Sequence, residues 1–351
     1  MVFRKKDHLV GLDIGSRTIK AAEVGDTKKG QVLEKFGAID IASGLIEDGS
    51  IKDPETIAES IRQLYHSNGI RENNVAISIG GYSVIVKKIN VQTMTEDHLQ
   101  ESIQFEAEQY IPFDISDVNL DFQILGENEH NPNQMSVLLV AAKKEMINDY
   151  INLTQMAGLN PCIIDVDAFA LQNIYELNYD AGEQNVALID IGASKTSLNI
   201  LKGNTSVFMR DVSLGCGQIN QKIASITDCT LEEAEEIKFG NQADKISQED
   251  LSDIISSVVA DWCTEIRRAL DFFYSTYPDE QIKRIVLSGG GGTIKEFREL
   301  LAVETSADVQ TINPFAGILV NESKFEPGFI EKIAPQASIC MGLAIRRVND
   351  K

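Results

Sequence analysis

Two stretches of the chain share one pattern of apolar and polar positions. Residues 10–24 read VGLDIGSRTIKAAEV, and residues 187–201 read ALIDIGASKTSLNIL. Each starts with an apolar run rich in β-branched residues, reaches an aspartate and a glycine, turns through small residues and then alternates between apolar and polar positions. This pattern predicts a β-hairpin at both places. Because the pattern occurs twice, we expect two related halves.

The residues after the first hairpin complete the first predicted half. A weak alternation over residues 31–41 predicts a third strand. Asp53 and Pro54 suit the cap and the first position of a helix, which Gly69 ends. Alternation over residues 75–79 predicts a fourth strand. The order of three strands, a helix and a strand is typical of a ribonuclease-H-like half.

A second α/β pattern over residues 83–165 predicts an insert between the halves. Within it, the stretch FEAEQYIPFDI at residues 105–115 is expected to end a helix, because Pro112 breaks the helical pattern. Its apolar side chains can cover the edge of a core. The expected helices of the insert are 96–111 and 144–157, and the expected strands are 84–91, 118–125, 135–142 and 162–166.

The second half begins at residue 185 with the second hairpin. Thr230 and Glu233 form the pattern of a helical capping box. A buried-type strand then runs from Ile285 into four glycines and an amphipathic helix. The expected helices are 168–176, 219–226, one starting at Thr230, 248–277, and a small-residue helix at 337–346.

Composition excludes several classes of function. The chain has 351 residues, of which 43% are hydrophobic, and a formal net charge of −21. An acidic surface repels nucleic acid and anionic lipid, so we expect direct binding to neither. No apolar run has the length of a signal peptide or a membrane span, so a soluble, cytoplasmic chain is expected. The five cysteines form no CxxC pair and the four histidines have no ligand spacing, so packed, reduced thiols are expected.

The chemistry of the repeated turn points to phosphate. Gly15 and Gly192 tolerate a positive φ, and the N–H groups of such turns line a concavity that suits an anion. Asp13 and Asp190 lie where each can hold a metal-bound water. Two facing turns would clamp one polyphosphate, and the four glycines at residues 289–292, before the amphipathic helix, would let the backbone approach a ligand closely.

The order of these parts resembles the superfamily of actin, heat-shock-70 and sugar-kinase ATPases. Within it, the chain is most similar to the PilM family of type IV pilus assembly proteins, relatives of the division protein FtsA. The resemblance covers nearly the whole chain. Its more specific marks are GLDIGSRTIKAAEV (11–24), FEAEQYIPFDI (105–115), DIGASKTSLNI (190–200) and EEAEEIK (232–238).

The resemblance implies an α/β, bilobal actin-like ATPase fold with two ribonuclease-H-like halves and a small α/β insert subdomain of the FtsA/PilM type. The implied division is 1–82 with 166–184 for the first lobe (1A), 83–165 for the insert (1C), 185–228 with 281–351 for the second lobe (2A), and 229–280 for a helical subdomain on the adenosine side (2B).

The resemblance also implies ATP and Mg²⁺ as cofactors. Asp13 and Asp190 are the candidate catalytic residues and would hold Mg²⁺ through water, and the expected ribose and base contacts are Glu235 and Lys238. Lys20 is either a phosphate contact or a solvated strand residue. The other expected nucleotide-binding residues are Gly15, Ser16, Thr18, Gly192, Ala193, Ser194, Thr196, Gly215, Gly289, Gly290 and Gly291.

Hydrolysis of ATP is expected to be slow or negligible. A water that attacks the γ-phosphate needs a positioned acceptor, and the sequence offers Asp13, Asp190 and Glu106. The second turn has Ala193 and Ser194 where more active relatives place a second glycine, so Cβ atoms crowd the phosphate approach. ATP would then act mainly as a structural or state-setting ligand.

The partner implied by the resemblance is the cytoplasmic N-terminal segment of the inner-membrane protein PilN, received in a groove between the first lobe and the insert, together with other inner-membrane pilus assembly proteins. The chain would thus touch the membrane only through a partner. The alternatives are an FtsA-like division protein, a small-molecule kinase of the sugar-kinase type, and a scaffold with a vestigial nucleotide site. The oligomeric state stays open, and an oligomer is compatible with the sequence.

Overall fold

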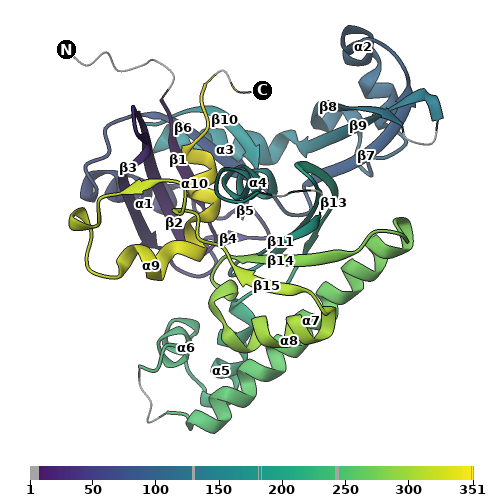
Figure 1. Cartoon of the computed structure of the whole chain (residues 1–351). Helices are drawn as coiled ribbons and strands as arrows, with labels where there is room; N and C mark the ends of the chain where they lie inside the picture. The colour runs from purple at the N-terminus through teal and green to yellow at the C-terminus, as the bar shows by residue number, and fades with distance from the viewer. Residues whose placement is uncertain are drawn as a thin grey trace.

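Two sheets, one in each half, form the frame of the protein (Figure 1). The computed structural model describes residues 8–128, 131–180, 182, 184–241, 245–348 and 350. The first sheet has the order β10-β6-β1-β2-β3-β16, and the second has the order β13-β12-β11-β14-β15. The strands of the first sheet are β1 (Val10–Ile14), β2 (Thr18–Thr27), β3 (Gly30–Asp40), β6 (Asn74–Ile79), β10 (Asn160–Val166) and β16 (Leu319–Val320). Those of the second are β11 (Asn185–Ile191), β12 (Thr196–Lys202), β13 (Thr205–Val212), β14 (Ile282–Ser288) and β15 (Asp308–Thr311).

Both predicted hairpins are present. β1 pairs with β2 antiparallel, and β11 pairs with β12 in the same way. Each first strand is then joined on its other side by a parallel strand, β6 in the first half and β14 in the second. The equivalence of the two sheets confirms the duplication that the sequence predicted.

Helix α1 (Pro54–Ser67) covers the first sheet. The side chain of Asp53 accepts a hydrogen bond from the N–H of Thr56 and so caps the helix as expected. The buried face includes Ile57, Ile61 and Leu64, which enter one core with β1 and β6. A small hairpin of β4 (Ile46–Glu47) and β5 (Ser50–Ile51) precedes α1.

Helices α5 (Gly217–Thr227), α6 (Leu231–Lys238), α7 (Gln248–Thr276) and α8 (Lys295–Thr305) pack on the second half. The capping box at Thr230 and Glu233 is present as predicted. The buried Trp262 of α7 meets the ring of Phe297 edge to face and donates a 2.7 Å hydrogen bond to Gln218. One core therefore joins α5, α7 and α8.

The insert has its own small core and projects from the first half (Figure 1). Its sheet has the order β7-β9-β8, with β7 (Val84–Gln92), β8 (Val118–Asn128) and β9 (Asn131–Lys143), and α2 (Glu96–Ala107) covers it. The helix ends at Ala107, earlier than the predicted residue 111. Tyr110, Ile111 and Phe113 pack against the insert core, so the stretch at residues 105–115 does cover a core edge.

The insert is smaller than the predicted 83–165. β10 lies parallel to β6 inside the first sheet, and α3 (Lys144–Met156) buries Met146, Tyr150 and Leu153 in the core of that half. This pairing joins residues that are distant in sequence, so a local pattern could not assign it. The segment 144–165 thus belongs to the first half.

The C-terminal segment, predicted as part of the second lobe, returns to the first half. β16 pairs with β3, while α9 (Phe329–Ile333) and α10 (Ser338–Ala344) follow. Helix α10 packs between β1 and α4 (Asp167–Asn178) (Figure 1). A Cβ on Gly342 would overlap the carbonyl of Ala170, and one on Gly11 would overlap that of Cys340. The glycines therefore permit backbone-to-backbone contact at this junction.

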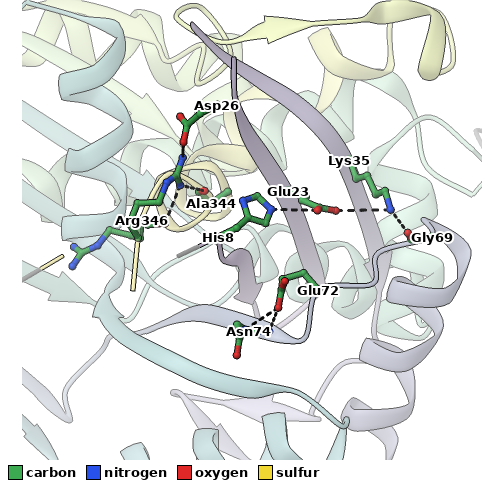
Figure 2. Close-up of polar contacts among 10 residues, drawn as sticks. His8, Glu23, Asp26, Lys35, Gly69, Glu72, Asn74, Ala344 and Arg346 are labelled. Atoms are coloured by element: carbon green, nitrogen blue, oxygen red, sulfur yellow. Dashed lines mark hydrogen bonds and ion pairs between the residues drawn. The ribbon is translucent and has the colours of Figure 1, made fainter. Parts of the chain in front are cut away.

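A cluster of polar contacts joins β2, β3 and the end of α1 (Figure 2). Buried Glu23 of β2 faces His8 at 3.2 Å and Lys35 of β3 at 3.8 Å, and Lys35 donates onward to the carbonyl of Gly69 after α1. This cluster joins two strands and a helix end and lies outside the cavities described below.

We predict that Gly342→Ala destabilises the chain by about 1–3 kcal/mol or more, because its methyl group has no space against Ala170. Urea or thermal unfolding measures this. The matched control is Gly25→Ala, whose Cβ has as its nearest neighbours the atoms of the flexible Glu34 side chain. Equal stability of the two variants would contradict the predicted close contact.

Candidate nucleotide site between the two halves

The two hairpin turns face each other across a cleft. The hydroxyl oxygens of Ser16 and Ser194, one from each turn, lie 3.0 Å apart. A cavity of about 440 Å³ opens beside them, lined from the first half by β1, β2 and β6 and from the second by the turn after β11, α6 and the glycines after β14. Its size is that of a small-molecule site.

Most of the predicted residues line this cleft. Those in its lining are Asp13, Gly15, Ser16, Thr18, Lys20, Asp190, Gly192, Ala193, Ser194, Glu235, Lys238, Gly289 and Gly290. Three do not line it. The hydroxyl of Thr196 is buried and donates to the carbonyl of Leu214 at 3.0 Å. Gly215 packs against the carbonyl of Ala193, and Gly291 packs against Ile191. These three residues therefore contact residues around the second turn and do not line the cavity.

The reason for glycine in the turns differs from the expectation. Neither Gly15 nor Gly192 has a positive φ. A Cβ on Gly15 would lie 2.8 Å from the carbonyl oxygen of Thr18, so glycine is needed for the tightness of the turn itself. A positive φ, +79°, occurs instead at Gly289, where a Cβ would also overlap the carbonyl of Ile191.

The two aspartates of the cleft, Asp13 and Asp190, have different charged neighbours. Asp13 accepts a 2.9 Å hydrogen bond from the ammonium group of Lys20. Lys20 is buried, so it is not the solvated strand residue that the sequence left open. Burial, together with the charges of Asp13 and Asp167, raises the pKa of Asp190 to about 6 although Ser288 hydrogen-bonds to it. Asp190 therefore favours a proton or a cation as partner.

Arg17 is a residue of the cleft that the sequence analysis missed. It extends from the first turn to Glu235 on α6, and it also donates to the carbonyl of Ile41 at 2.9 Å. Glu235 is shared with Lys238, whose Nζ lies 3.5 Å from it. Half-burial opposes the charge of Glu235, but Arg17 and Lys238 hold its pKa below the usual range. The expected ribose contact is thus paired across the cleft.

A second missed pair consists of Lys195 and Asp167. The Nζ of Lys195, in the second turn, lies 2.5 Å from Oδ2 of Asp167 at the start of α4. The hydroxyl of Ser78 donates to Oδ1 of Asp167 at 2.6 Å. Burial alone would raise the pKa of Asp167, but Lys195 and Ser78 keep it lowered. The only sequence signal was a lysine inside a phosphate-type turn.

The donor set fits Mg²⁺ held through water. Among the described residues, no group of three or more histidine, cysteine, aspartate or glutamate side chains is arranged to hold a metal ion directly. Mg²⁺ keeps most of its water and needs one or two carboxylates, which Asp13 and Asp190 provide in the cleft. Glu106, the third acceptor considered from the sequence, lies on α2 of the insert and is absent from the cleft lining.

Two ribonuclease-H-like halves that close on facing hairpin turns define an actin-like ATPase fold. A profile of the family described as type IV pilus assembly protein PilM matches residues 11–348, and the chain belongs to that family. The resemblance seen in the sequence is therefore confirmed. No helix among the described residues is long and apolar enough to cross a membrane.

Solved structures agree with this assignment. The structure titled PilM-PilN type IV pilus biogenesis complex has a TM-score of 0.84 at 27% sequence identity and covers 96% of this chain and 98% of that chain. MreB5 of Spiroplasma citri bound to ADP has a TM-score of 0.52 at 12% identity, covers 96% of this chain and 95% of its own, and is similar in fold alone.

A curated relative is more distant. The cell division protein FtsA of Bacillus subtilis (strain 168) is 23% identical over 252 residues, which are 65% of this chain and 57% of FtsA. The match thus spans little more than half of that protein. The comparisons therefore favour a type IV pilus assembly protein over an FtsA-like division protein or a small-molecule kinase.

We predict that Asp190→Asn stabilises the nucleotide-free chain above pH 6. The pKa of Asp190, about 6, lies above its unfolded value, so the folded state binds more protons there and loses stability as pH rises from about 4 to 6. Asparagine removes this loss, worth on the order of 1 kcal/mol per pH unit. Urea unfolding at pH 4, 6 and 8 measures it, and a difference from the parent chain that does not grow with pH would contradict it.

Proposed function

We propose that this chain is a nucleotide-binding, cytoplasmic platform of type IV pilus assembly that is held at the inner membrane by the N-terminal cytoplasmic segment of PilN. The observation that carries the proposal is the whole-chain similarity to PilM in the solved PilM-PilN complex, insert included. The family match over residues 11–348 supports the same role.

Nucleotide binding is supported by the donors of the cleft. Ser16 and Ser194 line the cavity from both turns, and their hydroxyl groups can donate to phosphate oxygens. Gly289 and Gly290 allow close approach on the side of Glu235 and Lys238. The fold neighbour MreB5 was solved with ADP. ATP with Mg²⁺ fits this donor set, and it would supply a terminal phosphate that contacts both halves.

Slow hydrolysis follows from how the carboxylates are engaged. A residue that activates water must accept its proton. Asp13 already accepts from Lys20, and Asp167 accepts from Lys195 and Ser78. Asp190 has a raised pKa, but it lies where Mg²⁺ would hold it. The nucleotide therefore sets the state of the protein more than it is consumed.

A second cavity, of about 640 Å³, suits an extended peptide. We call this cavity the groove. Its lining consists of residues 80–82, 84–88, 166–168, 197, 207–212, 272, 276 and 277. The second half therefore lines it together with the first half and the insert, whereas the resemblance implied a groove between the first lobe and the insert alone. β7 and β13 are edge strands of their own sheets, so each leaves backbone N–H and C=O groups available for a further strand. Val84, Val86 and Phe272 provide apolar contacts. This combination is typical of β-strand addition.

We predict that ATP with Mg²⁺ binds the purified chain and that Asp190→Ala weakens this binding at least tenfold while the binding of a PilN N-terminal peptide persists. Isothermal titration calorimetry measures both. Failure of ATP to bind the parent chain at millimolar concentration would refute the nucleotide role. A phosphate release assay on the same sample should show negligible turnover, and steady release above a few per minute would contradict the state-setting role.

We predict that Phe272→Ala weakens binding of the PilN peptide roughly tenfold or more, because Phe272 is an exposed aromatic side chain of the groove lining. Phe105→Ala is the matched variant, since Phe105 is also an exposed aromatic side chain but lies on α2 outside the groove. If Phe105→Ala alone weakens the peptide, the stretch at residues 105–115 forms the docking site and the groove does not.

A further inference from the structure

The groove and the nucleotide cleft share part of one wall. Asp167 and Gly80 line both cavities. Asp167 begins α4, and Gly80 follows the last residue of β6, so the shared wall belongs to the first half. A change in the charge or position of Asp167 therefore reaches both cavities without any rearrangement in between.

Lys195, which belongs to the second half, pairs with the carboxylate of Asp167 on this shared wall. It belongs to the second phosphate-type turn and lines the cleft, and its Nζ lies 2.5 Å from Asp167. A Cβ on Gly80 would overlap both Nζ of Lys195 and Oδ2 of Asp167, so the ion pair lies directly on the Gly80 backbone. Burial opposes the charge of Lys195, yet Asp167 and Asp211 raise its pKa. Lys195 is thus held as a cation between two acids.

Lys195 differs from the other cations of the cleft in where its acidic partner lies. In the described part of the chain, Lys20 pairs with Asp13, and Arg17 and Lys238 both pair with Glu235, all inside the cleft, while Lys295 pairs with Glu299, which lines neither cavity. Only the partner of Lys195 also lines the groove. Phosphate oxygens that attract Lys195 would therefore leave a carboxylate exposed to the groove.

The groove has two acids, Asp167 and Asp211, at one end and two lysines further along β7, and Arg210 beside Asp211 also lines it. At the acidic end, Asp211 accepts a 2.5 Å hydrogen bond from the N–H of Gly81, next to Asp167. Val84 closes a turn on the carbonyl of Gly81, and Lys87 and Lys88 lie further along β7, about 10–13 Å from Val84 by the rise of an extended strand. An extended peptide would therefore fit best with a positive group, such as a basic side chain or an α-amine, at the Asp167 end.

We propose that Lys195 is a phosphate-binding residue that couples the two cavities by exchanging Asp167 for phosphate. When Lys195 turns toward phosphate, Asp167 keeps only the hydrogen bond from Ser78 and can accept a cationic group of the groove ligand. The coupling is reciprocal, because a cation that takes Asp167 frees Lys195 for phosphate. The inference rests on the proposed function, since it needs both ligands.

Calorimetry tests the inference by titrating the PilN N-terminal peptide into the chain with and without saturating ATP and Mg²⁺, and by titrating ATP with and without peptide. In the parent chain each ligand should tighten the other by the same factor, roughly 5- to 150-fold. Lys195→Met should weaken ATP, whereas Asp167→Asn should tighten ATP in the absence of peptide because it frees Lys195. Both variants should reduce the coupling factor to about one.

Two further variants separate a specific role from general damage. Lys195→Arg keeps the charge and should restore most of the coupling. Arg17→Gln removes a cleft cation whose acidic partner lies outside the groove lining, so it should weaken ATP but leave the coupling factor intact.

The outcomes distinguish the inference from the function on which it rests. If both ligands bind the parent chain but without mutual effect, or if coupling persists in Lys195→Met, the inference is wrong and the proposed function stands. If either ligand fails to bind the parent chain, both are wrong. Circular dichroism and unfolding midpoints of every variant establish that each is folded, and the Asp167→Asn result decides the case should Lys195→Met not fold.

Discussion

The shared core around α10, which packs closely on β1 and α4, sets the relation between the two halves on which the cleft depends. A glycine on each side, Gly11 and Gly342, lets the chains approach to a distance that no side chain would permit. Around this junction one core unites Ala22 and Leu171 of the first half with Leu188 and Val286 of the second. The turns that follow β1 and β11 are therefore placed opposite each other by packing, before any ligand binds.

The charged residues of the surface and of the cleft then determine which ligands the cleft can bind. The chain has 53 acidic and 32 basic residues, so a polyanion meets an unfavourable surface overall. Inside the cleft the cations are kept in place by carboxylates, as with Lys20 on Asp13 and Lys195 on Asp167. Removing a charge from water is costly unless it is paired, and these pairs lower that cost in the empty protein. Phosphate must compete with the carboxylates, which favours selective over tight binding.

The sequence was a good guide where structure is local and a poor one where it is not. The hairpins, the Asp53 cap and the capping box at Thr230 depend on residues a few positions apart, and all were predictable. The pairing of β10 with β6 joins residues far apart in sequence, so the predicted insert included residues that belong to the first half. Arg17 and Asp167 were missed for the same reason, because their partners come from the opposite half.

Each of the two turns carries a cationic side chain that crosses the cleft to an acidic residue of the other half. The first turn sends Arg17 from the first half to Glu235 of the second, and the second turn sends Lys195 from the second half to Asp167 of the first. Both cation-bearing turns meet where phosphate would lie, since Ser16 and Ser194 are in contact there. An anion that attracts both cations would break two ion pairs between the halves and replace them with a bridge through itself. The halves are thus held together in either state, and what changes is which acidic side chain, Glu235 or Asp167, is left for another partner.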